Sequence, residues 1–111
     1  MPQTPPKTAE ACRTRAIELR SKGRLDEALK MFELALRIQP DYAPAYNNLG
    51  NTFLSLSQIN EAIISLQKAI ELKPDYALAH RNLGHALKEK GELRAAEREY
   101  AEAKRLERKS K

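Results

Sequence analysis

The sequence predicts an all-α fold in which three helix–turn–helix units stack against one another. The first observation is a repeat of 34 residues, because the Pro-Asp-Tyr-Ala segment at 40–43 returns unchanged at 74–77. The second is the apolar spacing of i, i+3, i+4 and i+7 within each repeat, which is typical of amphipathic helices. A unit of this length cannot bury its apolar face alone, so successive copies must pack together.

Length and composition agree with this fold class. The chain has 111 residues, which suits one domain with a core that needs no disulfide or metal. It is 41% hydrophobic and 32% charged, as expected of a soluble, helix-rich protein. No apolar run approaches the ~20 residues of a membrane span.

The units and their helices follow in order along the chain. Unit 1 is 9–42, unit 2 is 43–76 and unit 3 is 77–110, so the repeat domain covers 9–111. A disordered arm is expected at 1–8, since its proline-rich start lacks the apolar core of a signal peptide. The expected helices are 9–22, 25–38, 43–56, 59–72, 77–90 and 93–107.

Four of the expected helices are justified by a stop signal or an apolar stripe. Gly23 and Gly91 follow the first helices of units 1 and 3, while Pro40 and Pro74 end the second helices of units 1 and 2. The second helix of unit 1 carries the stripe Leu25, Ala28, Leu29, Phe32, Ala35, Leu36 and Ile38. That of unit 2 carries Ile59, Ala62, Ile63, Leu66, Ala69 and Ile70.

Small residues recur in fixed registers and predict close helix contacts. The three registers are Ala16, Gly50 and Gly84; Ala28, Ala62 and Ala96; and Ala35, Ala69 and Ala103. Helix axes approach to ~8–10 Å depending on the side chains at the contact. Glycine inside a helix costs ~1 kcal/mol relative to alanine, so Gly50 and Gly84 are expected where helices press closest.

These residues resemble the tetratricopeptide repeat (TPR), whose pattern runs from an aromatic residue through Leu-Gly to a final proline. Unit 2 gives Tyr46, Leu49, Gly50, Phe53, Ala62, Leu66, Ala69 and Pro74. Unit 3 gives His80, Leu83, Gly84, Leu87, Ala96, Tyr100 and Ala103, with Arg108 in place of proline; unit 1 departs at Cys12 and Arg15. The Asn-Leu-Gly segments are similar to repeats of O-linked glycosyltransferases and of bacterial TPR proteins. The resemblance implies a right-handed superhelical solenoid.

The two ends of the chain depart from the interior pattern. The last helix presents Glu97, Arg98, Glu102, Lys104 and Arg105, and Lys104 stands where units 1 and 2 have leucine and isoleucine. Terminal repeats need such a polar outer face, so a self-capped, monomeric three-unit domain is predicted. A dimer that exchanges terminal helices is the alternative.

The family resemblance places a binding groove on the first helices of the three units. By position it would present Arg13, Arg20, Asn47, Asn48, Asn51, Arg81, Asn82, His85 and Lys88, with Ile17, Leu54 and Leu78 among them. Asn48 and Asn82 share one register, so they could form an amide ladder for a peptide backbone or could support the fold. The cations would favour acidic peptides or a terminal carboxylate, or could be ordinary solvated charges.

One known form of this groove is excluded. The chaperone-binding subclass holds a terminal carboxylate with five polar residues, and only Arg13 and Asn48 fit its pattern. Ile17, Leu78 and Asn82 occupy the other three positions. The sequence therefore predicts a protein or peptide partner, possibly acidic, without a chaperone-tail clamp.

No enzyme, cofactor or metal site is predicted. His80 and His85 are five residues apart, about 140° around a helix, so they do not share a metal-ligand face. Cys12 lies in a packing register, has no histidine near it in the sequence, and as the single cysteine cannot form an internal disulfide. These features favour a reducing, cytoplasmic location and a non-enzymatic scaffold.

Two other functions stay open at this stage. The net charge of +5 and pI near 9.5 come largely from residues 104–111, where no aromatic residue interleaves the cations, so nucleic-acid binding is a weaker hypothesis. A self-associating or engineered repeat module without a natural ligand is the other. No membrane partner is expected.

Overall fold

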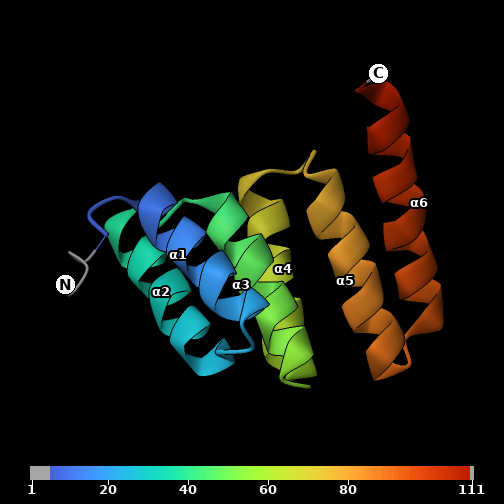
Figure 1. Cartoon of the computed structure of the whole chain (residues 1–111). Coiled ribbons are helices and arrows are strands. Elements are labelled where there is room, and N and C mark those ends of the chain that lie inside the picture. The colour runs from blue at the N-terminus through green and yellow to red at the C-terminus, as the bar shows by residue number, and fades with distance from the viewer. Residues whose placement is uncertain (1–5, 111) are drawn as a thin grey trace.

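The computed structural model describes residues 6–110, and they form six α-helices in chain order (Figure 1). Their bounds are α1 Ala9–Ser21, α2 Leu25–Ile38, α3 Ala43–Ser55, α4 Ile59–Leu72, α5 Ala77–Lys90 and α6 Leu93–Lys109. The predicted boundaries therefore hold to within two residues at every end. Most of the predicted arm lies outside the described residues. The Thr8 hydroxyl accepts a hydrogen bond from the Ala11 amide at 3.0 Å and caps α1.

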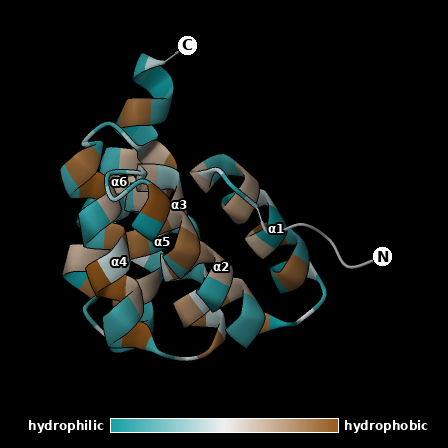
Figure 2. Ribbon diagram, turned by 90° about the vertical axis from the view of Figure 1, so that its left-hand side faces the viewer, coloured by the Kyte–Doolittle hydropathy of each residue, from teal (hydrophilic) through white to brown (hydrophobic). Residues whose placement is uncertain are grey.

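The helices form three antiparallel pairs that stack in chain order. The pairs are α1 with α2, α3 with α4 and α5 with α6, while α2 packs on α3 and α4 packs on α5. In Figure 2 every labelled helix carries both hydrophobic and hydrophilic residues, as expected when each buries one side only. The predicted all-α solenoid of three helix–turn–helix units is confirmed.

The turn inside each unit requires a left-handed residue at the same repeat position. Gly23 and Gly91 supply it with φ of +76° and +91°, as their place after a helix predicts. Unit 2 has Ser57 there, with φ of +60°. The repeat alignment identifies this position, but the sequence alone does not show that a serine adopts the strained backbone.

The two helical glycines lie where the second helix of their own unit presses closest. A Cβ at Gly50 would lie 2.6 Å from Leu66 Cγ, and one at Gly84 would lie 2.7 Å from Tyr100 Cε1. Carbon atoms that are not bonded to each other do not approach so closely, so any larger residue displaces the neighbour. The prediction that these glycines mark close packing is confirmed.

The last helix is longer than α2 and α4. It runs for 17 residues, against 14 in each of the other two, and Arg108 stands where proline ends the earlier units. Without that proline the backbone keeps its hydrogen bonds through Lys109. Leu106, at the repeat position where α2 and α4 end with Ile38 and Leu72, is buried.

Candidate functional site: the first-helix surface

The first helices α1, α3 and α5 are neighbours, and we call the surface they share the first-helix surface. Two side-chain hydrogen bonds join them. Arg13 Nε donates to Asn48 Oδ1 at 2.8 Å, and Asn82 Nδ2 donates to Asn47 Oδ1 at 2.9 Å. Each bond links the fifth residue of one unit to the sixth residue of the next. The structure thus brings four of the predicted groove residues together as two equivalent pairs.

These four residues differ in how far a ligand could reach them. Asn47 and Asn82 are 1% and 6% exposed, so their amides are largely closed to solvent. The Arg13 side chain keeps 27% exposure and also lies 3.4 Å from a Glu10 carboxylate oxygen. Each of the three paired amides has one intramolecular partner, as a scaffold role requires, although the buried Asn47 Nδ2 has no hydrogen-bond partner among the described residues. Their role in binding remains a prediction.

Two tyrosines join this surface that the sequence reasoning did not include. They are Tyr42 and Tyr76 of the repeated Pro-Asp-Tyr-Ala segment. The Tyr42 hydroxyl donates to a Glu10 carboxylate oxygen. Burial raises the pKa of Tyr76 above its ordinary value, and the neighbouring Arg13 and Asn47 partly offset that rise. Their place could have been predicted from the sequence, because the Pro-Asp-Tyr-Ala segment recurs unchanged just before the first helix of units 2 and 3.

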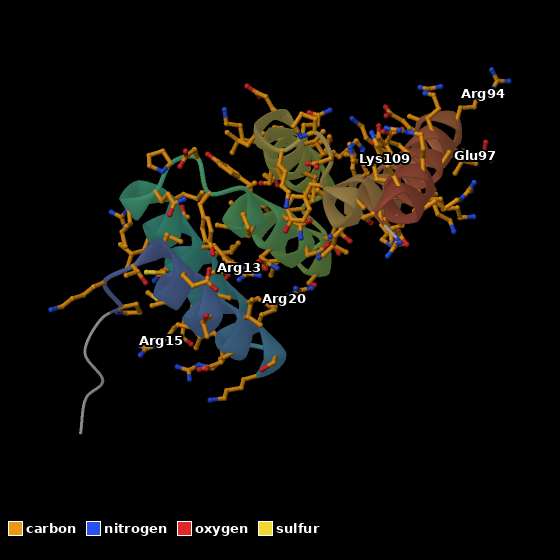
Figure 3. The ribbon with its side chains drawn as sticks, turned by 90° about the horizontal axis from the view of Figure 1, so that it is seen from above. Arg13, Arg15, Arg20, Arg94, Glu97 and Lys109 are labelled. Carbon is orange, nitrogen blue, oxygen red and sulfur yellow. The ribbon has the colours of Figure 1, made fainter. Side chains whose placement is uncertain are left out.

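Apolar side chains are exposed beside this polar cluster. Ile17 on α1 is 38% exposed and Leu78 on α5 is 46% exposed. Asn51 and Arg20 are partly buried on α3 and α1. In Figure 3, Arg13 and Arg20 lie along α1 on the side toward α3, whereas Arg15 points away from it.

Three predicted groove residues of α5 lie on the side toward α6. Arg81 forms an ion pair with Glu107, and the Tyr100 hydroxyl lies 2.8 Å from His85 Nδ1. Lys88 lines a small cavity with residues of α6. These three residues therefore border the end of the array, apart from the Arg13 cluster.

The other chemically notable side chains serve packing. His80 is buried, and its ring nitrogens lie 2.7 Å from a Glu99 carboxylate oxygen and 2.9 Å from the Pro74 carbonyl oxygen. Cys12 is fully buried, and burial raises the pKa of its thiol. Within residues 6–110 no three histidine, cysteine or acidic side chains are grouped to hold a metal ion.

Part of the basic C-terminal end is neutralised within α6. Arg105 Nε and Nη2 contact the two Glu102 carboxylate oxygens at 3.0 and 2.5 Å, and the guanidinium lowers the pKa of Glu102. None of the described helices is long and apolar enough to cross a membrane.

Comparisons with known proteins agree on the repeat. Sequence models described as TPR repeat match residues 17–57 and 50–91, and one described as tetratricopeptide repeat matches 79–110. No curated protein sequence matches the chain significantly.

Solved structures share the fold. The structure of MamA is 26% identical with a TM-score of 0.86; the match covers 93% of this chain and 60% of that chain. This chain thus spans less than two thirds of the MamA chain. The first and second TPR domains of Spaghetti (RPAP3), each bound to the HSP90 peptide SRMEEVD, are 20% identical with TM-scores of 0.87 and 0.85. These matches cover 89% and 88% of this chain, and 79% and 91% of theirs.

Proposed function

The chain belongs to the tetratricopeptide-repeat family, and we propose that it is a non-enzymatic scaffold that binds an extended peptide or a partner helix. The binding site would be the first-helix surface, which the family resemblance identifies as a concave groove. Both Spaghetti domains were solved with a bound peptide, which supports a peptide as the ligand class.

The observation that carries the proposal is the combination of a partly exposed cation with exposed apolar side chains. Arg13 is partly exposed, its bond to Asn48 holds the guanidinium in place, and its other contact is an exposed Glu10 carboxylate oxygen at 3.4 Å. Ile17 exposes apolar surface on α1, the helix that also carries Arg13, and Leu78 exposes apolar surface on α5. Such a surface suits a peptide that has an acidic group next to an apolar side chain, because the cation orients the acid while the apolar contacts supply burial.

The proposed site differs from a five-residue carboxylate clamp. Ile17 and Leu78 are apolar, and Asn82 is closed off by Asn47. A ligand that depended only on a terminal carboxylate would find two of the five clamp residues, Arg13 and Asn48. We therefore propose that apolar contacts contribute as much to recognition as charge does.

The test is selection of a random peptide library, followed by measurement of Kd for the selected peptides. Arg13→Ala should weaken binding by roughly tenfold, because a hydrogen bond to a charged group is worth about 1.5–3 kcal/mol. Arg94→Ala is the matched control, since Arg94 is exposed at the other end of the array (Figure 3). If Arg13→Ala and Arg94→Ala bind the selected peptides equally, the first-helix surface is not the site.

The amide ladder needs its own experiment. The double variant Asn48→Ala/Asn82→Ala should lower peptide affinity several-fold if the amides contact the ligand, since a net hydrogen bond is worth about 0.5–1.5 kcal/mol. Lower stability with unchanged affinity of the folded protein would instead assign both residues to the scaffold. Urea denaturation and calorimetry on the same samples separate the two results.

A further inference from the structure

The contact between units 2 and 3 shows how this chain stacks one unit on the next. Ile63 and Leu66 of α4 are in one buried cluster with Leu83, Ala86 and Leu87 of α5. Leu54 and Ile59 pack against the same cluster. The second helix of one unit and the first helix of the next thus provide two faces that fit together.

The same positions of unit 3 form a face on which no further described helix packs, although Ala96 within it is buried by its own unit. We call it the C-terminal face: Lys88, Leu93, Ala96, Glu97 and Tyr100. They line a cavity of about 200 Å³ and stand one repeat after Leu54, Ile59, Ala62, Ile63 and Leu66. Leu93 is 58% exposed, so this face keeps apolar surface in spite of its charges.

The opposite end of the chain carries the complementary positions. We call this the N-terminal face: Arg15, Glu18 and Leu19 of α1, which stand two repeats before Leu83, Ala86 and Leu87. Together with residues of α2 that include Met31, they line a cleft of about 530 Å³. In Figure 3, Arg15 and Glu97 lie at the two ends of the array.

Comparison of the internal contact with the two end faces shows paired changes. Leu19 is at the Leu87 position, so it would pack on Leu93 and Tyr100 as Leu87 packs in its own cluster. Arg15 replaces Leu83, while Glu97 replaces Ile63 of the same cluster. Two apolar members of one cluster have therefore been exchanged for two residues of opposite charge. If the two end faces only had to be soluble, the charges at these paired positions would not need to be opposite in sign.

We propose that a second copy of this chain docks head to tail, with the N-terminal face of one copy on the C-terminal face of the other. The contact would pair Arg15 with Glu97 of the neighbouring copy and bury Leu19 against Leu93 and Tyr100. Because the two faces are different, the contact is heterologous and each added copy leaves a free face at both ends. The association should be weaker than the internal stacking, since a charged pair must lose water on docking.

The test is sedimentation equilibrium of the whole chain from about 1 μM to 1 mM at low salt, conditions under which screening is weakest. We expect a mean mass that rises with concentration and does not stop at the dimer. Arg15→Glu and Glu97→Arg should each weaken association by about tenfold or more, because like charges would face each other. Arg94→Glu and Glu89→Arg are the matched controls, since both residues are exposed outside the two faces.

Restoration of the pair makes the test specific. An equimolar mixture of the Arg15→Glu and Glu97→Arg proteins, and the double variant alone, should both associate again, because opposite charges face each other in each case. Circular dichroism confirms that every variant is folded. Any of three results would overturn the proposal. The chain could stay monomeric to 1 mM, or it could associate in a way that these charges do not affect, as a helix-swapped dimer would. The third is a double variant that does not associate again.

Discussion

Substitution of Gly50 by alanine tests how tightly α3 packs on α4. The new methyl carbon would lie 2.6 Å from Leu66 Cγ, 2.8 Å from Leu66 Cδ2 and 3.3 Å from the Ala62 carbonyl oxygen. Leu66 has no exposed surface, so it cannot swing into solvent. Overpacking of this kind costs about 1–3 kcal/mol, and two contacts under 3.0 Å place Gly50→Ala at the upper end.

Helix propensity opposes this cost. Alanine is favoured over glycine inside a helix by about 1 kcal/mol, so the net loss of unfolding free energy should be about 2 kcal/mol. Urea denaturation followed by circular dichroism gives this value. The control is Gly84→Ala, whose neighbour Tyr100 is only partly buried at the end of the array and can turn aside, so its loss should be smaller.

A double-mutant cycle identifies the cause. Leu66→Ala alone removes a buried side chain and should cost about 2–5 kcal/mol. In Gly50→Ala/Leu66→Ala the methyl group meets no leucine, so the combined cost should fall below the sum of the two single costs. Strict additivity, or a Gly50→Ala protein as stable as the wild type, would refute the close contact.

Two further predictions concern single positions. Ser57→Gly should raise the unfolding free energy by about 0.5–1 kcal/mol. The left-handed backbone costs a non-glycine residue about 1–2 kcal/mol, and part of that gain is lost because glycine makes the unfolded chain more flexible. Ser55→Gly, inside α3, should lower the unfolding free energy in the same urea titration. The raised pKa of Tyr76 means that the folded chain favours the neutral phenol, so the stability that Tyr76 contributes should be constant below the ordinary value of 10.0 and should fall as pH rises through it. Tyr76→Phe should reduce this alkaline loss, and a pH dependence equal to that of the wild type would show that Tyr76 is not its source.

The sequence predicted the fold closely because its signals are local and repeated. Apolar spacing, Gly23, Gly91 and the prolines each act within one helix or turn, and three copies confirm one another. Where a signal was missing, the boundary moved: Arg108 in place of proline let α6 continue to Lys109. The left-handed backbone of Ser57 was not predicted, because a serine does not by itself indicate that conformation. The alignment of Ser57 with Gly23 and Gly91 in the repeat does indicate it.

The candidate site was less predictable because it depends on contacts between units. The repeat spacing placed Asn47, Asn48 and Asn82 on first helices. It could not show that Asn47 and Asn82 form a hydrogen bond with each other and are buried. It also could not show that Arg81 and His85 would contact residues of α6. Side-chain partners from different units follow from the superhelical geometry, which the repeat period alone does not specify.

The two proposed surfaces can be altered separately because one helix carries both. Successive residues of an α-helix are about 100° apart, so Arg13 and Arg15 project in nearly opposite directions from α1. Arg13 faces α3 and bonds to Asn48, whereas Arg15 lines the cleft at the N-terminal face. Peptide binding should therefore respond to position 13 and self-association to position 15. A peptide that bound the first-helix surface would leave both end faces free, so a stacked array of copies would display one binding surface per copy.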